Sequence, residues 1–176
     1  MTGTQNLLFR WCRAEADARG LAGLFRINLT ASYISHSELQ GPRALALGKW
    51  VDSIEQVLEA DLLRRVVSPL DAPPQGETQL AAVLEVDGHA RGVFLITFSR
   101  TAPVSYCILE DIVIDSTSRS RGWGAAYLKW ITSECRTRGI NRLFLESGKD
   151  NERAHAFFEH HGFEPVSIVM MKDLKS

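Results

Sequence analysis

The stretch of sequence that decides the fold is Arg119-Ser120-Arg121-Gly122-Trp123-Gly124-Ala125. It follows Tyr106–Ile114, a run rich in Ile, Leu and Val that predicts a β-strand, and it opens a segment with helical periodicity. Two glycines in a strand-to-helix turn expose backbone N–H groups at the positive end of the helix dipole. The turn is therefore predicted to hold a pyrophosphate, with Arg119 and Arg121 adding positive charge, and the alternative is that its glycines serve only helix packing.

The segments on both sides of this turn predict a mixed α/β domain with helices packed on a central sheet. Upstream, two strands at residues 80–86 and 91–98 are joined by Asp87-Gly88, a strong signal for a tight hairpin. Downstream, a helix ended by Gly139 is followed by a short strand, a helix stopped by Gly162 and a last strand, at residues 142–146, 151–161 and 168–171. The first of these helices has one apolar face, made of Tyr127, Leu128, Ile131 and Cys135.

The N-terminal part shows weaker patterns. Residues 6–13 are compatible with an edge strand and residues 15–26 with a helix. A long amphipathic helix is predicted over residues 43–66, because apolar residues recur there at steps of four and three, and Pro42 suits its first turn. On this helix, the acidic residues Glu55, Glu59 and Asp61 are expected on a solvated face, and the alternative is a patch that attracts an amine. Residues 68–77 contain three prolines and are predicted to form a long loop.

The length and composition indicate one compact domain with a hydrophobic core. The chain has 176 residues, of which 45% are hydrophobic, and a formal net charge of -1. No global positive field therefore attracts nucleic acid or an anionic membrane, and no apolar run is long enough to span one. The cysteines are Cys12, Cys107 and Cys135; their odd number and wide spacing predict free buried thiols and a cytoplasmic location.

Two motifs resemble the GNAT (Gcn5-related N-acetyltransferase) family. Arg119-x-x-Gly122-x-Gly124 is similar to the signature by which this family's pyrophosphate loop is recognised. The second motif starts at Asn151, contains the aromatic pair Phe157-Phe158 and ends at Gly162-Phe163. The resemblance extends from about Leu80 to the C-terminus. It implies a single GNAT-like domain with an acceptor or lid half at residues 1–79 and an acetyl-CoA-binding half at residues 80–176.

The resemblance also implies a fold and a set of binding residues. A GNAT-like mixed sheet has flanking helices and a splayed parallel strand pair, here 106–114 and 142–146, whose gap admits the pantetheine arm of acetyl-CoA. The cofactor-binding residues implied are Ile112, Val113 and Ile114 on the strand, Arg119, Ser120, Arg121, Gly122, Trp123, Gly124 and Ala125 in the turn, and Asn151, Phe157 and Phe158 in the last helix.

Glu110 is the predicted general base. The run Leu109-Glu110-Asp111 resembles that of polyamine acetyltransferases in the family, in which the glutamate takes the proton of the amine, often through water. If the strand alternates, Glu110 and Asp111 face opposite sides, and only one of them points at the substrate. The alternative is that Glu110 is a solvated or ion-paired strand residue.

Phe158 departs from the family pattern, because a tyrosine usually stands there and protonates the coenzyme A thiolate. Three alternatives stay open: water, Ser147 or His155 supplies the proton; the thiolate leaves unprotonated; or the domain binds acyl-CoA without turning it over. The histidines at 155, 160 and 161 lack a second ligand pair of recognised spacing, so no metal is expected.

The resemblance favours an N-acetyltransferase that uses acetyl-CoA and acts on a primary amine of a small molecule. The alternatives are a non-catalytic acyl-CoA-binding regulatory module and a protein or peptide N-acetyltransferase. A Rossmann nucleotide-binding enzyme is disfavoured, because its glycine fingerprint follows the first strand of the domain. Homodimers are common in the family, so a homodimer is possible, although no sequence feature establishes one.

Overall fold

The computed structural model describes residues 5–66, 76–118 and 120–174, and it divides into two compact units. The first unit is formed by Met1–Leu29 and Asp52–Glu146, and the second by Thr30–Val51 and Ser147–Ser176. Each unit thus combines two separate stretches of the chain.

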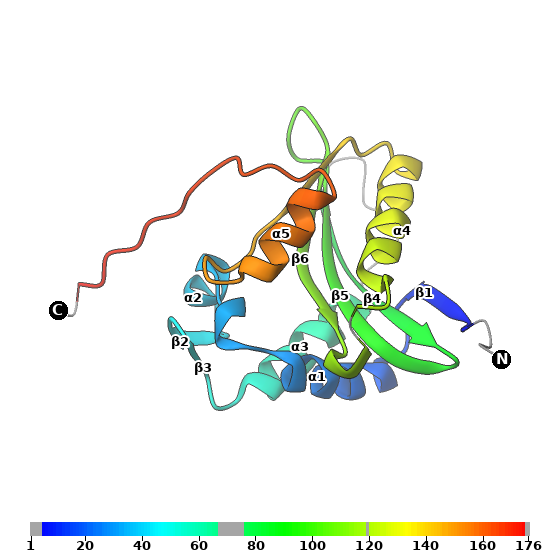
Figure 1. Ribbon diagram of the computed structural model, residues 1–176, viewed down its shortest axis with the longest axis horizontal. Helices are drawn as coiled ribbons and strands as arrows, with labels where there is room; N and C mark the ends of the chain where they lie inside the picture. Colours follow the sequence, from blue (N-terminus) through cyan, green and yellow to red (C-terminus); the bar gives the residue numbers. More distant parts are fainter. Residues whose placement is uncertain (1–4, 67–75, 119, 175–176) are drawn as a thin grey trace. The chain divides into compact units, whose positions relative to one another are not determined.

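A five-stranded mixed sheet is the centre of the first unit (Figure 1). Its order is β1-β4-β5-β6-β7, with antiparallel pairing from β1 to β6 and parallel pairing between β6 and β7. The strands are β1 (Leu7–Trp11), β4 (Glu77–Val86), β5 (His89–Ser99), β6 (Tyr106–Ile114) and β7 (Arg142–Leu145). The predicted hairpin is confirmed, since Asp87 and Gly88 connect β4 to β5 with φ values of 50° and 78°.

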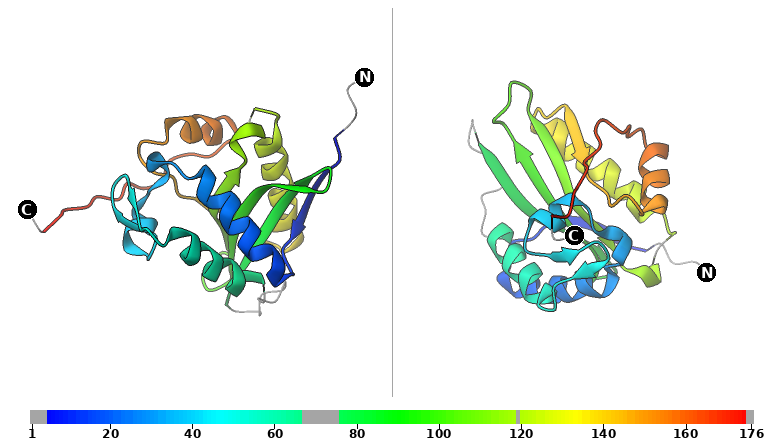
Figure 2. Two further views of the ribbon diagram at one scale, coloured as in Figure 1. Left: turned by 90° about the horizontal axis from the view of Figure 1, so that it is seen from below. Right: turned by 90° about the vertical axis from the view of Figure 1, so that its left-hand side faces the viewer.

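Helices cover both faces of this sheet (Figures 1 and 2). On one face lie α1 (Glu15–Asn28) and α3 (Ile54–Val66), and on the other lies α4 (Trp123–Thr137). The Tyr127 ring of α4 stacks on Phe94 of β5 with centroids 3.7 Å apart. The apolar face predicted for α4 is buried, and Gly139, with φ of 68°, follows the helix as expected. The predicted mixed α/β fold with a parallel strand pair is confirmed.

The second unit contains short elements and one longer helix. They are the 3-10 helix η1 (Ala31–Tyr33), α2 (His36–Gln40), β2 (Ala44–Ala46), β3 (Lys49–Trp50) and α5 (Glu152–His160). A Cβ atom on Gly148 would lie 2.3 Å from the carbonyl oxygen of Ser32 and 2.6 Å from that of Ile34. Only glycine therefore allows the chain that precedes α5 to approach the residues around η1 so closely.

The long helix predicted over residues 43–66 is wrong in its first half. This half forms the β2–β3 hairpin, and the helix α3 begins only at Ile54. Gly48, with φ of 76°, adopts a left-handed conformation that an α-helix does not tolerate, and Leu47 is 52% exposed. The helical spacing of Leu47 and Val51 with the later apolar residues was therefore coincidental.

The last strand predicted at residues 168–171 is also not formed. Within the part of the chain that the structure describes, these residues pair with no strand, and Ile168 and Met170 are 89% and 90% exposed. Their β-branched and apolar character favours a strand, but a strand forms only where a neighbouring strand pairs with it. Most of the long loop predicted at residues 68–77 lies outside the described residues, and Glu77 already begins β4.

The three cysteines are free and buried, as predicted. Burial raises the pKa of the Cys12 thiol to about 12, and a hydrogen bond with Cys135 together with burial raises the pKa of Cys107. Cys12 and Cys107 are therefore thiols and not nucleophilic thiolates. Among the described residues, no helix is both long and apolar enough to cross a membrane.

Candidate active site

Glu110 occupies a β-bulge in β6. The register pairs Leu109 with Ile96 and Asp111 with Leu95, so Glu110 is an extra residue with no direct partner position on β5. The pairing also places Asp111 on the face of Leu95, which is the face of Thr97 two residues later. The prediction that Glu110 and Asp111 face opposite sides of the sheet assumed regular alternation along β6, and the bulge interrupts this alternation. The two residues still differ in burial, since Asp111 is buried and Glu110 is partly exposed.

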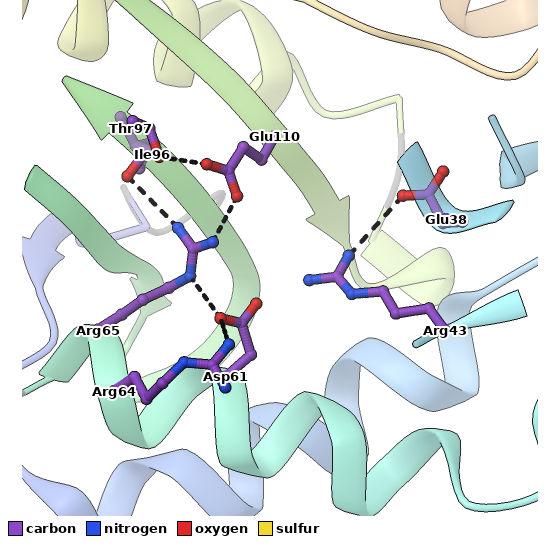
Figure 3. Close-up of polar contacts among 8 residues, drawn as sticks. All are labelled: Glu38, Arg43, Asp61, Arg64, Arg65, Ile96, Thr97 and Glu110. Carbon is purple, nitrogen blue, oxygen red and sulfur yellow. Dashed lines mark hydrogen bonds and ion pairs between the residues drawn. The ribbon is translucent and has the colours of Figure 1, made fainter. Parts of the chain in front are cut away.

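Both carboxylate oxygens of Glu110 accept a hydrogen bond (Figure 3). Thr97 of β5 donates its hydroxyl to Oε1, and Arg65 of α3 donates from Nη2 to Oε2. The Glu110 side chain is 28% exposed. The carboxylate is thus held in one orientation, while part of the Glu110 side chain stays accessible to solvent.

Arg65 is the centre of this network, with only 3% of its side chain exposed. Its Nε donates to Asp61 Oδ1 at 3.1 Å, and its Nη1 donates to the Ile96 carbonyl at 3.5 Å. Arg64, which is 69% exposed, also donates to Asp61 at 2.8 Å. The expectation that Asp61 lies on a solvated helix face is wrong, because its side chain is buried and paired.

Sequence reasoning missed Arg65 and Thr97, although α3 carried a signal. The buried stripe of this helix consists of Ile54, Leu58, Asp61, Leu62, Arg65 and Val66. Opposite charges four residues apart within an otherwise apolar stripe indicate a buried ion pair, and a buried pair needs further partners to satisfy its remaining atoms. No comparable signal marks Thr97, whose role depends on the register of β5 and β6.

The parallel pairing of β6 and β7 ends early. It runs from Tyr106↔Arg142 to Leu109↔Leu145, whereas β6 continues to Ile114 alongside β5. Ile112, Val113 and Ile114 therefore lie beyond the point where the parallel ladder stops, and Glu110 is the first residue after it. The early end of the parallel ladder agrees with the splayed strand pair that the family resemblance implies.

The turn after β6 is anchored by Asp115. Its carboxylate accepts hydrogen bonds from the backbone N–H and hydroxyl of Thr117 at 3.0 and 2.8 Å, and it pairs with Arg91 at 3.0 Å. Burial raises the pKa of Asp115, but the hydrogen bonds from Thr117 and the charge of Arg91 together bring it below its ordinary value. The carboxylate fixes the short 3-10 helix η2 (Ser116–Ser118), which leads from β6 towards the glycine turn.

The glycine turn has the backbone conformation that an anion site requires. Ser120 and Gly122 have φ values of 64° and 79°, and Gly122 is the N-cap of α4. Trp123 is buried in the first turn of the helix, Gly124 and Ala125 are partly buried, and the guanidinium of Arg121 lies 5.7 Å from the Trp123 ring. The first N–H groups of α4 lack acceptors within the helix and point out of its N-terminus. Arg119 lies outside the described residues.

The remaining predicted residues belong to the second unit. Asn151 is the N-cap of α5, but its side chain makes no capping hydrogen bond with the described residues. Phe157 and Phe158 have ring centroids 5.2 Å apart, and Phe158, 9% exposed, also packs against Phe163 at 5.6 Å. The Ser147 hydroxyl is buried and has no hydrogen-bond partner among the described residues. His155 is partly buried on α5.

The described residues contain no group of three or more His, Cys, Asp or Glu side chains placed to hold a metal ion. His161 instead contacts the Phe157 carbonyl through Nδ1 at 2.7 Å, and its ring lies 5.3 Å from that of His160. These contacts are consistent with a structural role of the two histidines at the end of α5.

Solved structures with a similar fold include several acetyltransferases. Aminoglycoside N-acetyltransferase AAC(6')-Iy in complex with CoA matches with a TM-score of 0.65 and 13% identity, covering 100% of this chain and 99% of that one. Ribosomal-protein-alanine N-acetyltransferase from Brucella melitensis matches with a TM-score of 0.61 and 13% identity, covering 96% and 100%. At these identities the likeness shows the fold.

Sequence comparisons connect the chain with the same group of proteins. Mycothiol acetyltransferase from Beutenbergia cavernae is 36% identical over 55 residues, which make up 31% of this chain and 18% of that protein. The model of the acetyltransferase (GNAT) family matches residues 50–163, a stretch that includes Glu110, the glycine turn and the motif from Asn151 to Phe163. Because this match covers well over half of the sequence, the chain belongs to the acetyltransferase (GNAT) family.

Proposed function

We propose that this chain is an acetyl-CoA-dependent N-acetyltransferase that acetylates a primary amine of a small molecule, with Glu110 as general base. The observation that carries the proposal is the position of Glu110 at a bulge in the strand that leads into the glycine turn. One strand thus supports both a fixed carboxylate and the turn whose N–H groups suit a pyrophosphate. The proposed base and the proposed donor-binding turn are thus close together along the chain, separated only by the end of β6 and η2.

The residues of the first unit fit acetyl-CoA. The left-handed conformation of Gly122 directs backbone N–H groups outward without a Cβ atom in the way, and Arg121 adds a positive charge. Ile112, Val113 and Ile114, beyond the end of the β6–β7 ladder, are proposed to line the pantetheine arm. Acetyl-CoA supplies the acetyl group as a thioester that is open to attack by a neutral amine.

The protein has to provide a proton acceptor for that amine. An amine attacks only after it has lost its proton, and a carboxylate fixed in one orientation accepts the proton directly or through one water molecule. Glu110 meets this requirement because Thr97 and Arg65 orient it while part of its side chain stays exposed. Water, Ser147 and His155 stay open as donors of the proton that the departing thiolate takes up.

A small-molecule acceptor is favoured by the relatives. One sequence relative is a mycothiol acetyltransferase, and one structural neighbour is an aminoglycoside N-acetyltransferase. The ribosomal-protein-alanine N-acetyltransferase among the structural neighbours keeps a protein acceptor as the competing candidate. The matched stretch covers only 18% of the mycothiol enzyme, so we extend to this chain the class of acceptor and not the compound.

The proposal is tested by titrating acetyl-CoA into the protein in a calorimeter and by measuring thiol release with polyamines, aminoglycosides, amino acids and lysine peptides. Micromolar binding together with thiol release on a small amine is the expected result. Turnover of peptides alone would indicate a protein or peptide acceptor in place of a small molecule. Binding without any turnover would favour a non-catalytic acyl-CoA-binding module. Absence of binding would contradict the proposal as a whole.

Phe158→Tyr is expected to raise kcat about tenfold, because it restores a hydroxyl at the position where the family usually has its proton donor. Thiol release at saturating acetyl-CoA measures the effect, and Phe163→Tyr, which alters a ring packed against Phe158, serves as control. An unchanged kcat would indicate that the thiolate leaves without help from this position.

A further inference from the structure

We infer that Arg65, held by Asp61, is a positioning residue that fixes Glu110 in the orientation needed to accept the proton of the amine. The inference rests on the proposed function, because it assigns to Glu110 the role of base. It concerns residues of α3, a helix whose arginines had no role in the sequence analysis. The contacts of Arg65, its burial and the charge of the cluster each support it.

The contacts fix the orientation of the Glu110 carboxylate but leave part of its hydrogen-bonding capacity unused. Each carboxylate oxygen accepts one hydrogen bond, Oε1 from Thr97 and Oε2 from Arg65. An ionised carboxylate offers about four lone-pair sites, so each oxygen retains one site for a proton or a water molecule. Two donors on separate oxygens define the plane of the carboxylate, which a single contact would leave free to rotate.

The Arg65 side chain is itself fixed, because it is buried and hydrogen-bonded on several sides. Three of its nitrogens have oxygen partners on three different elements, namely Asp61 on α3, Ile96 on β5 and Glu110 on β6. The guanidinium is planar and its N–H directions are fixed, so these contacts leave it little freedom. This matters at a bulge, because an extra residue lacks the regular pairing that would otherwise orient it.

The charges of the cluster also suit a base. Asp61 and Glu110 flank a single buried guanidinium; these three groups carry one net negative charge, which Arg64, also paired with Asp61, brings to zero. Because solvent screens the exposed Arg64, Asp61 mainly compensates the buried Arg65, so that Arg65 orients Glu110 without cancelling the negative charge that attracts an ammonium group. Arg64 also contacts Asp61, but it is largely exposed and donates no hydrogen bond to Glu110 among those the structure records.

Adjacent residues provide a matched test. Arg65→Lys keeps the charge but loses the forked geometry, and it is expected to lower kcat about tenfold while the KM for the amine and the Kd for acetyl-CoA stay within twofold. Arg64→Lys changes the neighbouring arginine in the same way and is expected to leave kcat unchanged. The assay is thiol release with an amine of the panel that the wild type acetylates, and thermal melting confirms that both variants are folded.

A double-mutant cycle separates positioning from a purely structural role. If Arg65 acts through Glu110, Arg65→Lys changes kcat less than about twofold when Glu110→Gln is already present. A tenfold loss in both backgrounds would overturn the inference, because Arg65 would then stabilise the fold or the site independently of Glu110. Equal kcat for Arg65→Lys and the wild type would overturn it as well.

Asp61→Asn is the second variant, for use if Arg65→Lys does not fold. It leaves Arg65 in place but weakens its anchor, and we expect a severalfold loss of kcat that disappears in the Glu110→Gln background. A loss that persists there, or no loss at all, would overturn the inference. The proposed function fails on different results: no turnover by the wild type, or full turnover by Glu110→Gln, would remove the base itself.

Discussion

Replacing Glu110 with glutamine is expected to lower kcat by about 10²- to 10⁴-fold, the range that a general base contributes. Glutamine has the same length, and its amide oxygen still accepts a hydrogen bond from Arg65 or Thr97, but it takes no proton from the amine. The loss corresponds to about 3 to 5 kcal/mol of transition-state stabilisation. Because Glu110 does not belong to the glycine turn, the affinity for acetyl-CoA is expected to change little. Steady-state thiol release and calorimetric titration measure the two quantities.

Glu85 offers a matched control for this variant. It is also a strand glutamate paired with an arginine, since Arg10 donates to it at 2.6 Å, and its side chain is 22% exposed, close to the value for Glu110. Glu85→Gln therefore removes a similar ion pair at the β1–β4 side of the sheet and is expected to keep the wild-type kcat. A Glu110→Gln variant within about threefold of the wild type would contradict the role of Glu110 as base.

The sequence predicted best those elements whose signals are local. The Asp87-Gly88 hairpin needs two residues with positive φ, and the start of α4 needs a glycine N-cap, so each is visible in a few adjacent residues. The strand Tyr106–Ile114 was predicted with its exact bounds because it is continuously apolar apart from two acids. The glycine turn was a candidate for the same reason, whereas Glu110 was predicted from the resemblance of Leu109-Glu110-Asp111 to polyamine acetyltransferases.

What the sequence did not reveal depends on contacts between distant residues. The bulge at Glu110 exists only in the pairing of β6 with β5, and the contact with Arg65 joins residues 45 positions apart. The apolar residues at 47 and 51 matched a helical spacing, but Gly48 lies between them and turns the chain into a hairpin. Residues 168–171 had the composition of a strand and found no partner among the described strands.

Gly122→Val is expected to weaken acetyl-CoA binding about 100-fold. Gly122 adopts φ of 79° at the N-cap of α4, and a β-branched residue is strained there even though a Cβ atom would meet nothing within 4 Å. Relief of that strain reorients the turn and with it the N–H groups proposed to bind the pyrophosphate. A hydrogen bond to a charged acceptor contributes about 1.5 to 3 kcal/mol, so loss of one alone reduces the affinity by one to two orders of magnitude. Calorimetric titration below the melting temperature measures the change.

Gly88→Val separates this effect from general destabilisation. Gly88 has φ of 78°, its Cβ position is equally open, and it lies in the β4–β5 hairpin away from the glycine turn along the chain. Both variants introduce the same backbone strain and are expected to melt at lower temperatures, but only Gly122→Val should lose affinity. Equal affinities for acetyl-CoA would mean that the turn does not bind the pyrophosphate. In that case, the left-handed glycine serves only to start α4.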